Sequence, residues 1–193
     1  EINRFFGLEA EKNYWMKLID LSFDISQYLS FDTKRVKEEA PNKREKTVYL
    51  AEVGKDLVVQ RDMIRRELRS HGFEVLPKNP ITGDRGDIEM AIKDNLSNAR
   101  LSLHLIGEDY GERIEGHDLS MIDFQNEIAH EYTGIMIKEN AKNDEKKRFG
   151  RLIWISQGIK NITERQKIFI ENIKTEAALH EETEVLEVDL EEM

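Results

Sequence analysis

The sequence predicts an α/β fold in which a five-stranded parallel sheet carries helices on both faces. Five short runs rich in β-branched and apolar residues alternate with four segments whose apolar residues recur at helical spacing. The third run, 101–107, is apolar at most positions, as expected for a strand buried on both faces. Such alternation is typical of parallel sheets, because parallel strands need a crossover connection. Right-handed crossovers favour the flavodoxin-like strand order 2-1-3-4-5.

The first strand is predicted over 47–53 (TVYLAEV), and the helix after it begins with Asp56 as its N-cap. Gly72 ends that helix, because glycine readily adopts the left-handed conformation of a helix C-terminus. The second strand follows at 73–77 (FEVLP). A loop marked by proline and glycine, 78–86, then leads into the next helix.

The second predicted helix begins at Asp87 and precedes the third strand. A longer glycine-containing loop separates the third strand from a helix over 120–139. The apolar stripe that this helix should bury is Met121, Phe124, Ile128, Tyr132 and Ile135.

The last strands are predicted over 151–156 (RLIWIS) and 184–188. Between them, Thr163 followed three residues later by Gln166 forms a capping box that opens the fourth helix. An acidic tail, 181–193, closes the chain.

Ahead of this pattern lies a long amphipathic helix within 1–32, with an unusually broad apolar face between 5 and 29. We expect it to pack on the following domain; dimerisation or contact with another domain is the alternative. A charged linker, 33–46, joins it to the main domain, 47–190. Because the chain opens with Glu1, we expect it to be a piece of a longer protein whose other domains are partners.

The charge of the chain argues against nucleic acid as a direct partner. The chain has 29 Lys and Arg residues and 39 Asp and Glu residues, which gives a net charge of −10. Seven of the acidic residues lie in 181–193, so the rest of the chain has a net charge of only −3. Phosphate-backbone binding needs a basic surface that this balance does not supply. With 0 Cys, the chain has no disulfide, thiolate metal site or Cys nucleophile, which is typical of cytoplasmic proteins. No apolar run reaches the roughly 18 residues of a membrane span.

Ligands of such sheets bind beyond the carboxyl ends of the strands where the strand order reverses, here between the first and third strands. The predicted site is therefore built by 52–56 and 107–120. It does not fit a receiver domain, because the third strand ends in Gly107 instead of a phosphoacceptor Asp. P-loop and dinucleotide glycine patterns are missing as well, so the glycines of 107–120 indicate loop flexibility. The histidines are scattered, so no metal site is predicted, and His104 is expected in the core.

One helical face at the predicted site carries polar side chains that can do chemistry. Ser120, Asp123, Glu127 and His130 recur at spacings of three and four, so they line one side of the helix that starts there. An ordinary solvated face is the structural alternative.

The segment 47–188 resembles a TIR-type domain. The resemblance rests on the strand and helix order, the opening TVYLAEV, the loop KNPITGDRG (78–86) in the place of the TIR BB loop, and DLSMIDFQNEIA. In NAD-cleaving TIR domains a glutamate of this helix is catalytic, commonly in a Trp-Cys-x-x-Glu segment. Glu127 matches that glutamate, whereas Asp123 and Phe124 replace the Trp-Cys pair. The sequence is more similar to bacterial TIR-like proteins than to animal receptor adaptors, and such bacterial domains commonly act in anti-phage defence.

The resemblance implies an NAD⁺ glycohydrolase that releases nicotinamide and forms ADP-ribose or a cyclic product. Glu127 would stabilise the positive charge that develops on the ribose, so NAD serves as substrate and no cofactor or metal is needed. The implied substrate-binding residues are Ala51, Glu52, Lys55, Ser120 and Asp123.

The resemblance also implies self-association through the loop 78–86, which would gate the pocket as well. The N-terminal helix is a second candidate for self-association. Two other functions remain open: a TIR-type interaction module without chemistry, and an enzyme similar to nucleoside 2-deoxyribosyltransferases, whose fold also places a glutamate at an anomeric carbon.

Overall fold

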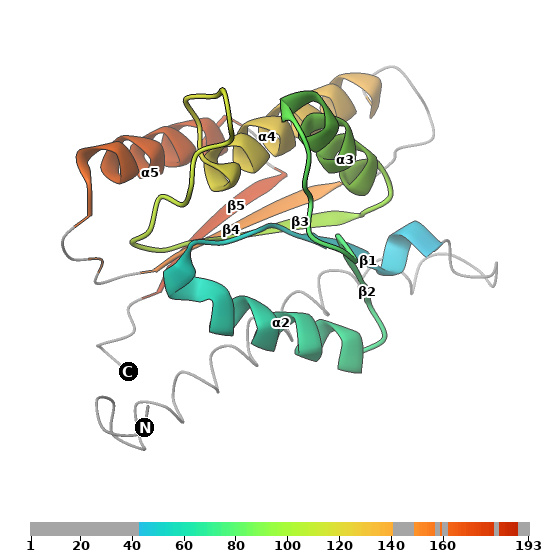
Figure 1. The fold of residues 1–193 in the computed structure, drawn as a ribbon. Coiled ribbons are helices and arrows are strands. Elements are labelled where there is room, and N and C mark those ends of the chain that lie inside the picture. The colour runs from blue at the N-terminus through green and yellow to red at the C-terminus, as the bar shows by residue number, and fades with distance from the viewer. Residues whose placement is uncertain (1–42, 141–148, 157–158, 160–161, 180–181, 189–193) are drawn as a thin grey trace, which may run out of the picture.

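The computed structural model describes residues 43–140, 149–156, 159, 162–179 and 182–188. Within these ranges, five parallel strands form one sheet in the order β2-β1-β3-β4-β5, which confirms the predicted α/β fold and strand order (Figure 1). The predicted N-terminal helix, residues 33–42 of the charged linker, and residues 181 and 189–193 of the acidic tail lie outside the described residues.

The elements follow the predicted order, with shorter strands at most positions. The strands are β1 (Thr47–Leu50), β2 (Glu74–Leu76), β3 (Leu101–Ile106), β4 (Gly150–Ser156) and β5 (Thr183–Val188). The helices are α2 (Val58–Ser70), α3 (Arg85–Ser97), α4 (Met121–Asn140) and α5 (Glu164–Ala177). Short 3₁₀ helices, η3 (Lys43–Lys46) and η4 (Lys55–Leu57), precede β1 and α2. None of these described helices has the length and apolar character needed to cross a membrane.

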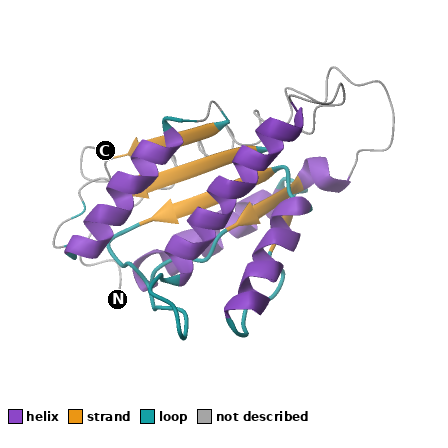
Figure 2. Cartoon of the chain, turned by 90° about the horizontal axis from the view of Figure 1, so that it is seen from above, coloured by secondary structure: helices purple, strands orange, loops and turns teal. Residues whose placement is uncertain are grey.

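The helices cover the two faces of the sheet unequally. Helices α3, α4 and α5 lie side by side on one face, and α2 lies on the other (Figures 1 and 2). The strands β3 and β4 pair from Leu101↔Gly150 to Ile106↔Ile155, whereas β1 pairs with β3 only from Val48 to Leu50. The first strand therefore leaves the sheet early, and the chain beyond it can turn towards the predicted site.

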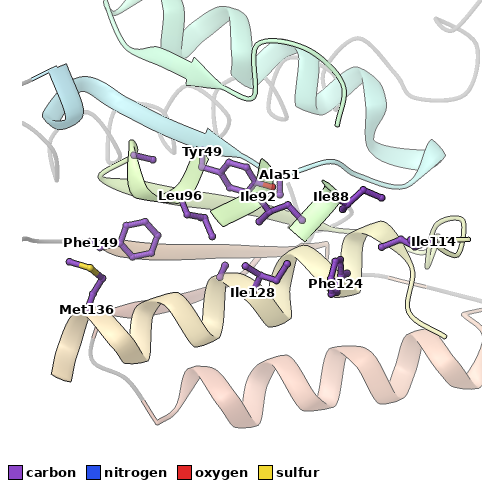
Figure 3. Close-up of a cluster of buried hydrophobic side chains, with 12 residues drawn as sticks. Tyr49, Ala51, Ile88, Ile92, Leu96, Ile114, Phe124, Ile128, Met136 and Phe149 are labelled. Atoms are coloured by element: carbon purple, nitrogen blue, oxygen red, sulfur yellow. The ribbon is translucent and has the colours of Figure 1, made fainter. Parts of the chain in front are cut away.

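The core on the three-helix side is built from residues of β1, α3 and α4. Tyr49, Ile92 and Leu96 meet Ile128 of α4 there (Figure 3), and all four are buried. The apolar residues of α3 and α4 recur three and four positions apart, so each helix turns one stripe inward. Burial of this stripe fixes α4 over the carboxyl ends of β1 and β3.

Side-chain caps define the beginnings of two helices. Asp84 accepts a hydrogen bond from the backbone N–H of Asp87 and so caps α3, three residues before the predicted start. Thr163 caps α5 by accepting from the backbone N–H of Gln166, as predicted. Gly72, with φ of 82°, follows α2 and allows its sharp end, which also agrees with the prediction.

The predicted apolar stripe of α4 is wrong at its last member. Ile135 is 52% exposed, whereas Met136 is buried in the cluster shared with α3. Ile122, outside the predicted stripe, is buried against α5 instead. The helix packs between α3 on one side and α5 on the other. Its buried face is therefore wider than the single apolar stripe that the sequence predicted.

A layer of polar side chains is buried between the sheet and α4. Arg151 of β4 is 1% exposed and donates to the side-chain and backbone oxygens of Asn126, at 3.0 and 3.2 Å. Burial lowers the pKa of Arg151 to about 10. His104 of β3 is fully buried near Arg151, and neither of its ring nitrogens has a hydrogen-bond partner within the described residues. The predicted core placement of His104 is therefore confirmed.

This burial predicts a loss of stability in mild acid. Desolvation, and then the Arg151 charge, hold the pKa of His104 well below its usual 6.5. At a pH between the folded and the unfolded pKa of His104, the unfolded chain binds more protons than the folded chain. The contribution of His104 to the free energy of unfolding is therefore complete above about pH 6.5. It falls as the pH drops, by up to about 1.4 kcal/mol per pH unit for one proton. His104→Gln should lose less stability than the parent between pH 7 and pH 5, measured by urea unfolding.

The matched control for this prediction is His71→Gln, at the exposed end of α2. It should keep the parental pH dependence, because it changes an exposed histidine and leaves the buried His104 in place. A His104→Gln protein with the parental slope would show that His104 is not the group that resists protonation.

Candidate functional site

Two loops meet at the carboxyl ends of β1 and β3, where the strand order reverses. Hydrogen bonds join them directly: the backbone N–H of Lys55 donates to Asp109 Oδ2 at 2.9 Å, and that of Glu108 donates to Asp56 Oδ2 at 2.6 Å. Backbone hydrogen bonds from Gly111 and Lys55 lower the pKa of Asp109. The two loops that were predicted to form the site are thus tied to each other.

The space between the loops is filled by the chain itself. A Cβ on Gly107 would lie 2.0 Å from Asp56 Oδ2, and one on Gly54 would lie 2.7 Å from Asp109 Cβ. Gln166 of α5 also donates to the Gly107 carbonyl, at 2.6 Å. Two expectations are corrected here. Asp56 does not cap α2, because its carboxylate binds the opposite loop, and Gly107 serves close packing instead of flexibility.

Arg61 of α2 holds the end of β1. Its buried guanidinium donates to the carbonyls of Ala51 and Leu50, at 2.6 and 3.1 Å, and to the carboxylate of Glu52 at 2.8 Å. Burial lowers the pKa of Arg61, and the nearby Glu52 charge opposes that shift. Leu50 is the last residue of β1 and Ala51 follows it, so the guanidinium supplies donors to carbonyls at the end of the strand, where the pairing with β2 has stopped.

Gln125 of α4 connects this loop to the three-helix side. Its side-chain oxygen accepts from the Tyr49 hydroxyl at 2.6 Å and from the backbone N–H of Glu52 at 3.0 Å. Its amide nitrogen donates to the Met121 carbonyl of its own helix. Burial raises the pKa of Tyr49, so the hydroxyl stays protonated and remains a donor.

The predicted substrate-binding residues of the first loop are engaged within the protein. Ala51 is buried, and Glu52 is half-buried in its pair with Arg61. Lys55 crosses to the other loop, where its Nζ lies 2.8 Å from Glu112 Oε1 with both side chains at least 80% exposed. An ion pair this exposed contributes little to stability, so water or a ligand can replace it.

Ser120 and Asp123 lie at the first turn of α4. Ser120 is buried, and its hydroxyl accepts from the backbone N–H of Asp123 at 3.3 Å, which makes it the cap of the helix. The Asp123 carboxylate accepts from the Tyr110 hydroxyl at 2.5 Å. Burial raises the pKa of Asp123, although the hydrogen bond from Tyr110 opposes this.

The structure does not bring Glu127 into the loop contact where it was expected. Gln125 is the α4 residue that contacts 51–55, and Glu127 follows it by two positions, about 200° around the helix. The Glu127 side chain is accordingly exposed. The buried amide of Gln125 takes the inward position, and within the described residues no hydrogen bond joins Glu127 to this loop, so the pocket that they would share stays a prediction.

Charged groups of three segments surround Glu127. Desolvation raises the pKa of its carboxyl, as do the charges of Glu131 and Asp123, while His117 and Arg85 act in the opposite direction. Arg85 is the first residue of α3 and lies within the predicted loop 78–86, and His117 belongs to the loop before α4. An acid on α4 thus faces two potential cations of neighbouring segments.

A buried aromatic ring supports these two basic groups. The Arg85 guanidinium carbon lies 5.7 Å from the centre of the Phe124 ring, and the His117 ring centre lies 5.3 Å from it. The backbone N–H of Leu119 donates to His117 Nδ1 at 3.0 Å, which leaves Nε2 to carry the proton of the neutral ring. Arg85, His117 and Glu127 define a polar surface, which we call the α3–α4 surface.

The remaining histidine of the predicted face points elsewhere. His130 is half-buried and its Nδ1 lies 4.0 Å from Glu176 of α5. The four residues predicted on one helix face are thus divided between a cap, a tyrosine contact, the α3–α4 surface and α5. Within the described part of the chain, no group of three or more His, Cys, Asp or Glu side chains could hold a metal ion.

Arg61 and Gln125 were missed as site residues, although the sequence contains a signal for each. Arg61 occupies an inward position between Leu57 and Ile64, where a charged residue is out of place unless it is paired. Gln125 lies next to Phe124 on the buried side of α4. A polar residue on the buried face of a helix therefore indicates a side chain that anchors a neighbouring segment.

Comparison of the chain with models of protein families, with curated proteins and with solved structures gives no match. The assignment of function therefore depends on the residues and geometry of this chain.

Arg61 provides a test of how the site is held. Arg61→Leu leaves the Leu50 and Ala51 carbonyls and the Glu52 carboxylate without their donor, so we expect a loss of roughly 3–5 kcal/mol in the free energy of unfolding. Chemical denaturation monitored by circular dichroism measures it. Arg66→Leu changes an exposed arginine of the same helix and should stay within about 0.5 kcal/mol of the parent. Equal losses in the two variants would contradict the anchoring role of Arg61.

Proposed function

We propose that the chain is a TIR-type NAD⁺ glycohydrolase in which Glu127 is the catalytic carboxylate. The observation that supports this most is the setting of Glu127: its exposed carboxylate lies near Arg85 and His117, and within the described residues no hydrogen bond or ion pair engages it. A carboxylate held beside basic groups and free to meet a ligand suits a substrate that carries both a ribose and phosphates.

The chemistry places modest demands on the protein. The bond between the ribose C1′ and the nicotinamide nitrogen breaks with its electron pair going to nitrogen, which releases neutral nicotinamide and leaves positive charge on the ribose. The Glu127 carboxylate opposes that charge. Water then adds to C1′ and loses a proton, which gives ADP-ribose; attack by the adenine ring gives a cyclic product instead.

The surrounding residues fit supporting roles. Arg85 would attract the diphosphate by its charge and His117 would donate a hydrogen bond to it from Nε2, since both lie on the α3–α4 surface with Glu127. On the side of the first loop, Lys55 would exchange the Glu112 carboxylate for a phosphate, because their exposed pair holds it weakly. Ala51 and Glu52 would keep the shape of that loop through Arg61.

Assembly of several copies belongs to this proposal. The loop 78–86 is exposed along most of its length and includes Arg85, so a neighbouring copy that contacts it would also shape the α3–α4 surface. We propose an assembled effector in the bacterial cytoplasm that depletes NAD in anti-phage defence, in line with the resemblance. Flanking domains of a longer chain would control the assembly.

One observation favours a second candidate, an interaction module without chemistry. The crevice where ligands of this fold class bind is filled by the Asp56 carboxylate and closed by hydrogen bonds between the loops. A domain used only for assembly has no need of an open crevice. The same exposed loop 78–86 would then carry the contacts between copies.

Glu127→Gln tests the proposed activity. The substitution keeps size and hydrogen-bonding capacity but removes the charge, so we expect nicotinamide release from NAD by the assembled protein to fall by about 100-fold or more. Glu131→Gln, one helical turn away and also exposed, is the matched control and should retain the parental rate at neutral pH. Chromatography of nicotinamide and ADP-ribose measures both.

Three outcomes separate the candidates. NAD left intact by a folded, assembled parent would support the interaction module. Base exchange on deoxynucleosides, without NAD cleavage, would support an enzyme similar to deoxyribosyltransferases. Equal rates for Glu127→Gln and the parent would assign the chemistry to another residue.

The pH dependence gives an independent check on Glu127. Because its pKa is raised by desolvation and by the neighbouring carboxylates, it becomes protonated at a higher pH than an ordinary glutamate. The ionised form is the active one, so activity should fall on the acid side, and Glu131→Gln, which removes one of these neighbours, should shift the fall to lower pH. An unchanged profile would argue against ionised Glu127 as the group that limits the rate.

A further inference from the structure

The face of the sheet that carries α2 has less helical cover than the opposite face. Three described helices lie on one face, but α2 alone lies on the other (Figures 1 and 2). Five strands place the outer strand axes about 19 Å apart, whereas a helix with its side chains is about 10–12 Å wide. One helix therefore leaves room beside it on this face.

Apolar side chains continue along this face from α2 towards β4 and β5. The cluster on the α2 face extends from Val75 of β2 to Leu152 and Trp154 of β4, with Leu186 of β5 packed against it. Leu152 and Trp154, each 8% exposed, are the most exposed buried members of the cluster, and Leu186 is only partly buried. Exposure thus increases towards β4 and β5, away from the edge formed by β2.

We propose that the N-terminal segment 5–29 packs as a helix along β4 and β5 on this face, beside α2. Its sequence carries the complementary surface, with Trp15, Leu18, Ile19 and Ile25 at helical spacing. The 25 residues would form a helix about 37 Å long, more than the roughly 23 Å of a seven-residue strand. The surface formed by Leu152, Trp154 and Leu186, named here the β4–β5 surface, is its docking site.

The position of the first described residues makes this contact reachable. The Nε of Arg44 donates to the Ala99 carbonyl at 3.0 Å, which fixes the start of the described chain beside the amino end of β3. From β1 to the far side of β4 is only two to three strand spacings, about 10–14 Å. The linker 33–42 can extend over about 33 Å, so it spans this distance without strain.

The alternative occupant, a second copy of the chain, has less support. The segment is part of the same chain and only one short linker away, so its effective concentration at the β4–β5 surface exceeds that of a separate molecule. The proposal is independent of the catalytic role of Glu127, because the β4–β5 surface lies on the opposite face of the sheet from α4.

Cysteine cross-linking in the full chain tests the proposal, since the natural sequence has 0 Cys. Ser22→Cys lies on the apolar side of the segment by its spacing, and Glu184→Cys is an exposed position two residues before Leu186 on the same side of β5. A short bismaleimide should join the two within one chain, to the same extent at all protein concentrations. Ser22→Cys with Met90→Cys, on α3 of the other face, is the control pair and should not react in this way.

Two results would overturn the proposal. Cross-linking no greater than in the control pair would show that the segment does not reach this face. Cross-linked dimers that increase with concentration, without the internal product, would assign the surface to a second copy.

Fluorescence gives a second measurement without cross-linkers. Of the two tryptophans, Trp15→Phe leaves only Trp154. In that background Leu18→Asp should raise acrylamide quenching of Trp154 about twofold, because a charge on the apolar side opposes its burial. Lys17→Asp alters the neighbouring position on the polar side and should leave quenching unchanged. Equal quenching in both variants would contradict docking over Trp154.

Discussion

The organisation of the site depends on how the backbone of β1 is satisfied where the strand leaves the sheet. β1 contributes only four residues, and its last carbonyls lie between a helix and a loop. Arg61 provides their donors from α2 and binds Glu52 with the same guanidinium. A planar group that makes three contacts fixes α2 against β1. The turn between β1 and α2 contains Lys55 and Asp56, and both residues form hydrogen bonds with the loop that follows β3.

Two neighbouring amides set the rotation of α4 about its axis. Gln125 is held by Tyr49 and the loop after β1, while Asn126 is held by the buried Arg151 of β4. Each amide would leave a buried partner unsatisfied if the helix turned, and such a loss costs more than an apolar mismatch. The direction of Glu127 is therefore a consequence of buried hydrogen bonds, and its exposed position is not an accident of a loosely packed surface.

The sequence was sufficient for the strand order and for most of the core, because both follow from the alternation of elements and from apolar spacing. It was insufficient where a polar side chain has a distant partner. Asp56 was expected to cap its own helix, but its hydrogen bond reaches Glu108 in another loop. Likewise, the exchange of Ile135 for Met136 on the buried face of α4 depends on the cluster shared with α3, a neighbour that local periodicity does not include. The partners of Gln125, the Tyr49 hydroxyl and the backbone N–H of Glu52, were unpredictable for the same reason.

The contacts between the two site loops differ in strength, and this difference determines how a ligand would gain access. The pair of Lys55 and Glu112 is exposed and easily exchanged, whereas Arg61 is buried and bound to three acceptors. Any opening of the crevice should therefore begin at Lys55 and leave β1 and α2 in place. Because Glu127 lies on the outer side of α4, a substrate would have to bridge from Lys55 across the first turn of that helix.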